Sequence, residues 1–293
     1  MSEPSTLTDG TVTLRPRAAS GSSAFDVETD GTVVGTVEVR VDDDGAGQLT
    51  YALDADHRGR GSATRAVRVA VDWALTDEGD GGLGLSRVQA VVPSSHEAAL
   101  RVATRSGLRR EGVRRVVAAD GELVVLARLA TDPPLSEPGA FRALLNSFLP
   151  RKRAIGQMLV RDEAGRVLCC HLTYKQDWDL PGGVVEVGES PQVAVARELV
   201  EELALTIPAG RLLLTDWLPP WSGWDDALCL VFDGGVHASS VVERIVPQAR
   251  EIRTAEFLTA DEVVERCADF TARRITAALA ALDGGAAYTE SGR

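Results

Sequence analysis

The first half of the chain shows a strand-like alternation of apolar and polar positions, followed by helical spacing. β-Branched residues and turn signals mark the strands, and Asp30–Gly31 supplies a turn inside the second apolar segment. Apolar residues then recur at i, i+3, i+4 and i+7 with polar residues opposite, and a later helix ends on Gly107. The predicted elements are strands over 11–17, 25–41, 47–54 and 86–92 and helices over 62–75 and 96–107.

The second half also mixes the two patterns, without repeating the first half. Two apolar segments flank a turn at Asp162–Gly165, and Thr259 with Glu262 forms a capping-box pattern before the last helix. Ser190 is a good N-cap for the helix that follows it. The predicted elements are strands over 154–160, 165–172, 211–218 and 227–232 and helices over 190–203 and 260–282.

Between the halves, the sequence TDPPLSEPGA holds three prolines and no apolar period, which predicts a linker. The segment at 141–149 has a short helical pattern that Pro150 stops, and we expect it to dock on the second domain. The predicted fold class is α/β (α+β). The expected layout is a first domain at 1–130, a linker at 131–140, a second domain at 141–285 and a tail at 286–293.

Length and composition restrict the function classes. The chain has 293 residues, 44% apolar and 25% charged, which is typical of a soluble two-domain protein. Its net charge of −12 repels a polyanion, so we expect no nucleic-acid strand as a partner. It has no apolar leader and no membrane-length apolar run, which predicts a cytoplasmic protein without a membrane partner. The four cysteines lack a metal or disulfide spacing and are expected to pack as small apolar residues.

Three carboxylates are predicted to share one face of the helix at 190–203. At 100° per residue, Glu198, Glu201 and Glu202 fall within an arc of about 100°. Unpaired carboxylates at this spacing repel each other by roughly a few tenths of a kcal/mol per pair, and a bound divalent cation removes that penalty. A solvated acidic face is the alternative. The opposite side is predicted to be apolar, with Val193, Ala196, Leu199, Val200 and Leu203.

The surroundings of these carboxylates favour a metal site. Arg197 can reach Glu201 at i+4 and hold its carboxylate in place. Gly182 and Gly183 let the backbone approach a metal closely, with a carbonyl as a further ligand. Glu189 closes the loop from its far end.

The order of these residues resembles the Nudix box of the Nudix hydrolases. The preceding segment WDLPGG is also typical of that family, whereas Ala204 stands where the box has glycine. This departure affects only the turn after the helix, at a cost of about 1 kcal/mol. The matching order is Gly183, five residues, Glu189, seven residues, Arg197-Glu198-Leu199, one residue and Glu201-Glu202.

The resemblance covers about residues 141–285 and implies a sheet sandwiched between helices. It implies hydrolysis of a phosphoanhydride in a nucleoside diphosphate linked to a group X, with Mg²⁺, or Mn²⁺ in its place, and a small nucleotide-type substrate. A carboxylate of the box takes the proton of the attacking water. The implied metal residues are Glu198, Glu201, Glu202 and Gly183, and the implied catalytic residues are Glu198, Glu201, Arg197 and Glu189.

Two features outside the box have more than one interpretation. Glu251 is a second candidate for the base, although a surface role is favoured. Trp217, Trp221 and Trp224, in the cluster WLPPWSGW, can stack on a nucleobase or pack in the core or in a lid.

A glycine turn in the first half precedes the helix at 62–75. Free backbone N–H groups at that helix start form a seat for a pyrophosphate, and a simple turn is the alternative. The turn resembles the acetyl-CoA loop of the GNAT acetyltransferases, in which Arg58, Gly61 and Ala63 match. The segments at 88–92 and 96–112 are similar to the strand and helix that complete the cofactor cleft in the ribosomal-protein acetyltransferase branch. The implied cofactor residues are Arg58, Gly59, Gly61, Ser62 and Ala63.

Transfer activity is less supported than the fold. Only about seven residues separate Arg17 from Phe25, too few for the two helices that line the acceptor side in GNAT relatives. His96 also replaces the usual asparagine, and His96 and Glu97 are read as exposed helix-start residues rather than proton-transfer groups. The leading hypothesis is a Nudix hydrolase fused to a GNAT-like domain that binds acetyl-CoA. The alternatives are a bifunctional acetyltransferase and hydrolase, and a ligand-sensing protein without turnover.

Overall fold

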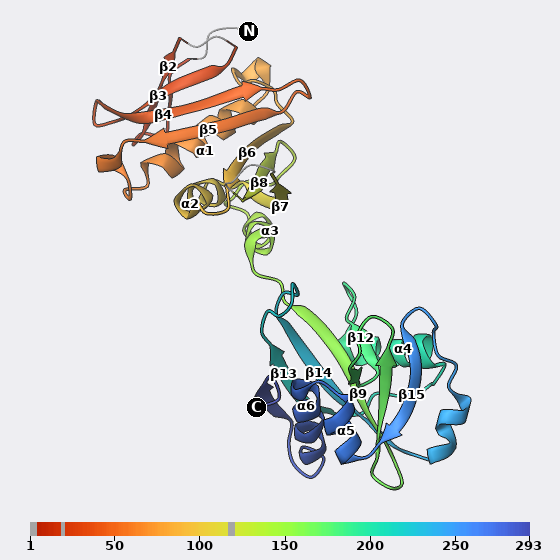
Figure 1. Cartoon of the computed structure of the whole chain (residues 1–293). Helices are drawn as coiled ribbons and strands as arrows, with labels where there is room; N and C mark the ends of the chain where they lie inside the picture. The colour runs from red at the N-terminus through yellow and green to blue at the C-terminus, as the bar shows by residue number, and fades with distance from the viewer. Residues whose placement is uncertain (1–4, 19–20, 117–120) are drawn as a thin grey trace. The chain divides into compact units, whose positions relative to one another are not determined.

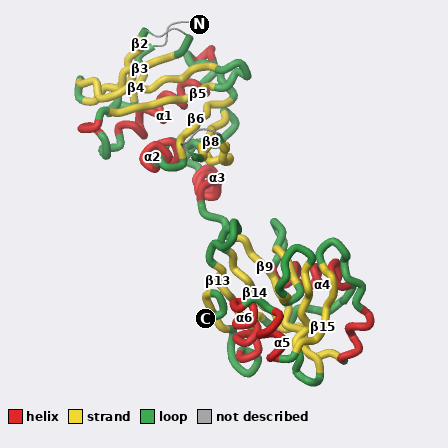
Figure 2. The backbone as a smooth tube through the Cα atoms, in the orientation of Figure 1, coloured by secondary structure: helices red, strands yellow, loops and turns green. Residues whose placement is uncertain are grey.

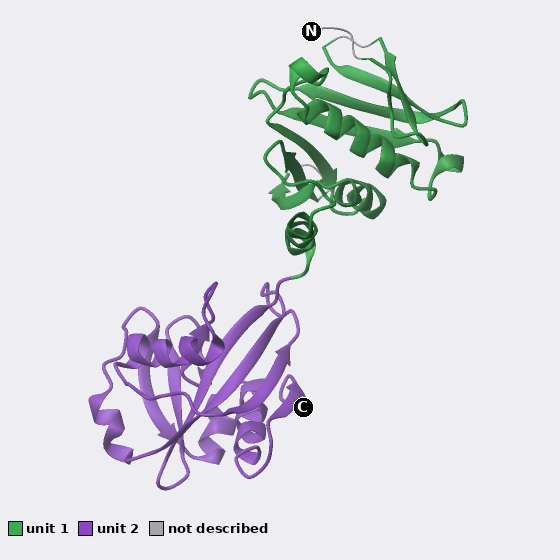
Figure 3. Ribbon diagram, turned by 180° about the vertical axis from the view of Figure 1, so that it is seen from behind, with its two compact units in different colours: residues 1–150 green, residues 151–293 purple. Residues whose placement is uncertain are grey.

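The computed structural model describes residues 5–18, 21–116 and 121–293. The chain divides into two compact units, Met1–Pro150 and Arg151–Arg293, drawn in two colours in Figure 3. Each unit is a mixture of helices and strands around its own sheet, as predicted. No helix in the described ranges has the length and apolar character needed to cross a membrane.

The first unit is built on one eight-stranded sheet in the order β1-β2-β3-β4-β5-β6-β8-β7 (Figure 1). Antiparallel pairing holds throughout, except that β5 runs parallel to β6. The elements are β1 (Leu7–Thr8), β2 (Thr13–Arg17), β3 (Ser23–Thr29), β4 (Thr32–Val41), β5 (Gly47–Leu53), α1 (Ser62–Leu75), β6 (Arg87–Pro93), α2 (Glu97–Arg105), β7 (Arg109–Arg115), β8 (Glu122–Leu129) and α3 (Pro138–Phe148).

Helix α1 supplies the centre of this unit's core and has the predicted bounds. Its apolar stripe packs on the sheet, and Trp73 meets Phe25 of β3 edge to face at 5.2 Å. The stripe is fully or almost fully buried, as the periodicity predicts: Ala66, Val67, Ala70, Val71 and Ala74.

The boundary between the units differs from the expected linker at 131–140. Helix α3 packs on β7 of the first unit, where Ser147 Oγ accepts a hydrogen bond from Arg110 N at 3.1 Å, and Leu144 is buried. The expectation that this segment docks on the second domain is therefore wrong. The helical pattern shows that α3 has an apolar face. It does not show which of the two sheets that face packs against.

The second unit is a sheet between helices, as Figures 1 and 2 show: α4 covers one face, and α5 and α6 cover the other. The sheet order is β11-β10-β9-β14-β13-β16, with β12 on β9 and β15 on β10. The elements are β9 (Arg153–Asp162), β10 (Val167–Leu172), β11 (Trp178–Asp179), β12 (Gly182–Val184), α4 (Pro191–Leu203), β13 (Leu212–Leu218), β14 (Ala227–His237), β15 (Ile252–Leu258), α5 (Ala260–Arg266), α6 (Asp269–Ala280) and β16 (Ala287–Glu290).

The sheet of the second unit opens between β9 and β10. These neighbouring strands pair only at Val167 and Arg161, near the turn that joins them. Beyond that point, β11 pairs with β10 and β12 pairs with β9, so the chain crosses the opening between Asp179 and Gly182. The crossing segment lies directly before the predicted box, which begins at Gly183, and this places the box at a gap in the sheet.

Two details of the second unit correct the sequence prediction. The helix expected over 260–282 is two helices, because Cys267 leaves the helix and bridges to Trp178. The residues expected as a tail form β16, which pairs in parallel with β13. The capping box of Thr259 and Glu262 is present as predicted, and all four cysteines are buried.

Candidate functional site

Helix α4 begins where the sequence predicts. The Ser190 side chain accepts a hydrogen bond from Val193 N, and Pro191 occupies the first turn. The buried face differs from the predicted one, because Val193 is 60% and Val200 48% exposed while Glu202 is 6% exposed. The carboxylates are therefore not equivalent: Glu202 points into the protein, and Glu201 lies at the surface with 56% of its side chain exposed.

Arg197 connects the loop to the helix. Its guanidinium lies 3.0 Å from Glu189, 3.0 Å from Glu198 and 2.9 Å from Glu201. The hydrogen bonds from Arg197 hold the pKa of the Glu189 carboxyl below its usual value. Arg197 thus fixes the loop end and the outer carboxylates in one network, as the spacing predicts for Glu201.

Two glycines bring the loop backbone against the helix. Gly182 has φ of +138°, and a Cβ there would stand 2.1 Å from the carbonyl oxygen of Gly156. A Cβ on Gly183 would stand 2.5 Å from the carboxyl carbon of Glu198. No side chain fits at Gly182, and one at Gly183 would have to displace the Glu198 carboxylate, because the Gly183 backbone lies directly against it.

The inner carboxylates crowd one another. Burial raises the pKa of Glu202 to about 8, with further contributions from the charges of Glu198 and Glu251. Burial also raises the pKa of Glu198, although Arg197 partly offsets it. Glu198 therefore lies close enough to raise the pKa of Glu202 at the gap in the sheet, with the exposed Glu251 nearby, and Arg197 pairs with Glu198.

Glu251 lies near this group and is exposed at the surface, as the sequence interpretation favoured. The segment before it is tied to the end of α4, because Gln248 N donates to Glu202 O at 2.8 Å. Glu251 O in turn accepts from Thr173 N at 2.8 Å, which fixes it beside β10. These backbone bonds join residues 46 and 78 positions apart in the chain, so no local motif could reveal them.

The donors present suit a hard divalent cation. Glu198, Glu202 and Glu251 offer only oxygen ligands, and the loop backbone at Gly183 lies against the Glu198 carboxylate. Within the described residues, no three His, Cys, Asp or Glu side chains already stand in the arrangement of a complete metal site. Glu198 is instead paired with Arg197. The suitability of the site for a cation therefore rests on its oxygen ligands and on the closeness of its carboxylates.

Helix α4 ends on a strained residue. Ala204 adopts φ of +57°, a left-handed conformation, and Leu205 N donates to Leu199 O at 3.1 Å. Because glycine populates this region without a steric penalty, Ala204→Gly is expected to stabilise the second unit by about 1 kcal/mol. Thermal unfolding measures this, and Ala196→Gly, inside the same helix, should lower the melting temperature. A lower melting temperature for Ala204→Gly would show that the turn is not strained.

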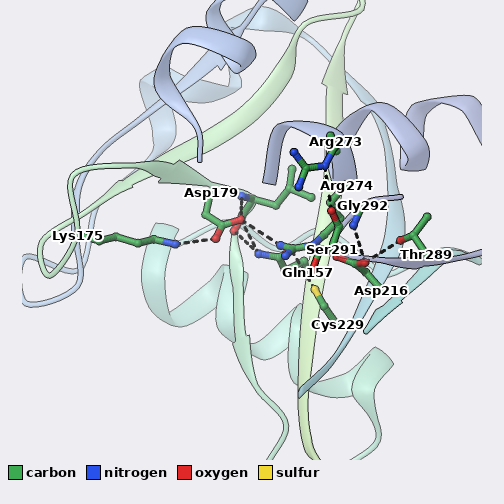
Figure 4. Close-up of polar contacts among 11 residues, drawn as sticks. Gln157, Lys175, Asp179, Asp216, Cys229, Arg273, Arg274, Thr289, Ser291 and Gly292 are labelled. Carbon is green, nitrogen blue, oxygen red and sulfur yellow. Dashed lines mark hydrogen bonds and ion pairs between the residues drawn. The ribbon is translucent and has the colours of Figure 1, made fainter. Parts of the chain in front are cut away.

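A buried ion network lies on the other face of the gap (Figure 4). Arg274 Nε donates to Asp216 at 2.9 Å, and Arg274 Nη1 donates to Gln157 at 2.9 Å and lies 3.7 Å from Asp179. Lys175 pairs with Asp179 from the surface side at 2.7 Å. Asp179 immediately precedes Leu180 and Pro181, so the network holds the strand that leads into the glycine loop. Sequence reasoning missed it because its members are scattered along the chain.

In the first unit, the glycine turn lies at the mouth of a cavity of about 330 Å³. Gly59 and Gly61 have φ of +79° and +85°, and α1 starts without a side-chain cap, which leaves its first N–H groups available. Arg58 Nε donates to Leu53 O at 3.0 Å and ties the turn to β5. The cavity is also lined by Ala63 and by arginines of α2, Arg101 and Arg105.

The cavity opens where two parallel strands separate. β5 and β6 pair only at Gly47–Val88 and Gln48–Gln89, and diverge beyond. Tyr51 stands in this opening and donates to Ala99 O at 2.7 Å. His96 caps α2, with its Nδ1 accepting from Ala99 N at 3.2 Å, in agreement with the helix-start interpretation.

The acceptor side of this opening lacks the two helices expected of GNAT relatives. β2 pairs directly with β3, from Thr13–Glu28 to Arg17–Ala24, and only 18–22 lie between the strands. The prediction that no helices fit there is confirmed by the register of this hairpin.

The tryptophans of the cluster differ in position. Trp221 and Trp224 lie in the turn between β13 and β14, 64% and 59% exposed, and Arg153 stacks over Trp224 at 4.8 Å. Trp217 is partly buried in β13. Trp178 is 8% exposed and packs in the core.

Fold and site together define the class of each unit. The second is a helix-covered sheet in which a carboxylate helix meets a glycine loop at a gap, and the first is a sheet that opens between parallel strands above a glycine turn. The NUDIX domain model matches residues 150–279, and the acetyltransferase (GNAT) domain model matches residues 5–109. The chain therefore belongs to the Nudix hydrolases, with a GNAT domain in its first half.

Individual relatives agree with this assignment. A MutT-like protein of Streptomyces ambofaciens is 32% identical over 142 residues, which cover 47% of this chain and 81% of the relative. A probable N-acetyltransferase of Bacillus subtilis is 34% identical over 90 residues, 30% of this chain, and the chain spans about half its length, 47%. The MutT protein of Methanosarcina mazei is a similar solved structure, with a TM-score of 0.39 and 20% identity, covering 46% of this chain and 97% of that one.

Proposed function

We propose that the second unit hydrolyses a phosphoanhydride of a nucleoside diphosphate linked to a group X, with Mg²⁺ or Mn²⁺ as cofactor. The observation that carries this is the position of the Glu198 carboxylate against the loop backbone at Gly183, with the buried Glu202 one turn further along the same helix. A metal held there, with Glu201 as an outer ligand, would supply positive charge to the phosphate oxygens and lower the pKa of the attacking water.

The residues of the chain have separate roles in this proposal. Glu198 is the best candidate to accept the proton of the attacking water, because it lies against the loop at Gly183 and is only 14% exposed. Arg197 holds Glu198 and Glu201 in position, and Glu189 fixes Arg197 from the loop side. Attack by water breaks the anhydride bond and leaves two phosphate-bearing products.

A screen of substrates tests this function. Nucleoside triphosphates, nucleotide sugars, ADP-ribose and dinucleotides are incubated with the full chain and Mg²⁺, and phosphate-bearing products are quantified. Turnover of at least one class that stops with a chelator is expected. No turnover of any class with Mg²⁺ or Mn²⁺ would reject the proposal and favour a ligand-sensing protein.

For the first unit we propose acetyl-CoA binding without acetyl transfer. The open cavity, the uncapped start of α1 and the arginines at Arg58, Arg101 and Arg105 suit the pyrophosphate of this cofactor. The missing acceptor helices argue against a bifunctional enzyme. Incubation with labelled acetyl-CoA and mixed amines separates the two, since transfer to any amine would support the bifunctional alternative.

A negative charge placed at Gly61 tests whether the glycine turn binds the pyrophosphate of acetyl-CoA. Asp and Asn both tolerate the left-handed backbone of this position, so Gly61→Asn and Gly61→Asp have nearly the same shape. Only the aspartate repels a pyrophosphate, and we expect it to weaken acetyl-CoA binding by about tenfold or more relative to the asparagine variant. Calorimetric titration measures both. Equal affinities would place the cofactor elsewhere or exclude it.

A further inference from the structure

Helix α6 carries a cavity that neither of the two proposed sites uses. Its volume is about 420 Å³, within the range of roughly 300–1,000 Å³ that is typical of small-molecule sites. The floor of the cavity is the helix itself, where the small side chains of Ala272, Ala277 and Ala280 leave room. Val264 of α5 also lines it and is 70% exposed. The cavity therefore offers a ligand an apolar surface that solvent can reach.

A tight turn forms a further wall of this cavity. Ser291 and Gly292, which follow β16, have φ of +54° and +75°. A Cβ on Gly292 would stand 2.6 Å from Arg273 Cβ, so the turn lies directly on the helix. Arg273 Nε donates to Ser291 O at 3.0 Å, as Figure 4 shows. The wall is therefore already in place without a ligand.

Two opposite charges line the cavity without pairing. Asp269 and Arg273 stand at i and i+4 on α6, the spacing at which opposite charges on a helix usually pair. In the described part of the chain, the ion pairs of α5 and α6 instead involve Arg266 and Arg274. The bond to Ser291 directs the Arg273 guanidinium toward the turn. A ligand in the cavity thus meets a carboxylate at one point and a guanidinium at another.

We propose that this cavity binds a free aliphatic α-amino acid. Asp269 contacts the ammonium group of the ligand, Arg273 contacts its carboxylate, and the aliphatic side chain lies on the alanines of α6. Other small ligands satisfy only part of the site. A phosphate would pair with Arg273 but bring its negative charge beside Asp269, and a simple amine would leave Arg273 without a partner.

The cavity shares residues with the buried ion network of the second unit. Gly292 N donates to Asp216 at 2.9 Å, and Asp216 also accepts from Arg274, the neighbour of Arg273. Thr289 of β16 bonds the same carboxylate at 2.8 Å. A ligand that holds the turn on the helix therefore also stabilises the pairing of β16, because it binds only the folded arrangement.

Titration calorimetry of the full chain with leucine, without metal or nucleotide, tests this site. Leucine is expected to bind at least about tenfold more tightly than serine, N-acetyl-leucine or leucinamide, which lack the aliphatic group, the ammonium and the carboxylate in turn. Asp269→Asn and Arg273→Gln are each expected to weaken leucine binding about tenfold. Asp261→Asn, in the first turn of α5, is the matched control and should leave binding unchanged. Leucine should also slow hydrogen exchange of 287–290.

The possible results decide each part of the inference. No binding of leucine at about 10 mM, or unchanged binding in both Asp269→Asn and Arg273→Gln, would overturn the site. Serine binding as tightly as leucine would contradict the aliphatic specificity, and equally tight N-acetyl-leucine would indicate the carboxyl end of a peptide instead of a free amino acid. Leucine binding with unchanged exchange of 287–290 would contradict the link to β16. None of these results depends on nucleotide turnover, so the hydrolase proposal is tested separately.

Discussion

Glu202→Gln is expected to lower the metal-dependent turnover of the second unit by about a thousandfold or more. Glu202 is 6% exposed and lies within the influence of the Glu198 and Glu251 charges, so glutamine removes the innermost carboxylate that could bind a metal. The amide has nearly the same shape and relieves like-charge repulsion, so the folded structure is expected to persist. Steady-state rates with Mg²⁺ and thermal unfolding of the same preparations measure both effects.

Glu201→Gln is the matched control on the same helix. Glu201 is 56% exposed and contacts Arg197. Its substitution is therefore expected to lower metal-dependent turnover only about tenfold to a hundredfold, the range typical of groups that orient a metal site. Mg²⁺ should raise the melting temperature of the wild-type protein and not that of Glu202→Gln. Wild-type turnover in Glu202→Gln would contradict the site assignment, and equal losses in both variants would contradict the inner and outer positions of the two carboxylates.

Asp216→Ala is expected to destabilise the second unit by about 3–5 kcal/mol, because it leaves the buried cation of Arg274 with a weaker partner. The carboxylate of Asp216 is fully buried and accepts hydrogen bonds from Arg274 Nε, Thr289 Oγ1 and Gly292 N, at 2.9, 2.8 and 2.9 Å. The last two belong to β16 and the residues after it, as Figure 4 shows. The substitution should therefore also release the C-terminal strand.

Differential scanning calorimetry of the full chain measures the loss of stability in Asp216→Ala. Tryptophan fluorescence in parallel identifies the unfolding of the second unit. Glu256→Ala is the control, since Glu256 is 50% exposed in its ion pair with Arg266 and surface pairs contribute little. Hydrogen exchange of 287–290 should rise only in Asp216→Ala. An Asp216→Ala protein as stable as the control would show that the buried network does not support this unit.

Local patterns predicted most of the elements and the outer part of the site. The apolar period fixed α1 to its observed bounds, and the i, i+4 spacing of Arg197 and Glu201 anticipated their ion pair. These features depend on residues within one or two turns of each other, for which spacing determines proximity.

Features that depend on distant contacts were not accessible from the sequence. Glu251 lies near the carboxylates through backbone bonds to the end of α4, and β16 joins the sheet through Asp216. Glu202 lies inside because the sheet, and not the helix period, decides which side of α4 is covered. The arrangement of Arg274 with Asp179 and Asp216 likewise requires three separate elements to pack together.

Hydrolysis in water enriched in ¹⁸O tests the central claim most directly. The full chain is incubated with Mg²⁺ and nucleotide compounds, with Glu202→Gln in parallel, and the phosphate products are analysed by mass spectrometry. Incorporation of ¹⁸O into one phosphate product by the wild-type protein alone is expected, because water attacks phosphorus and breaks the anhydride bond. Equal ¹⁸O incorporation in Glu202→Gln, or none in the wild-type protein with any compound, would contradict a hydrolytic site at these carboxylates.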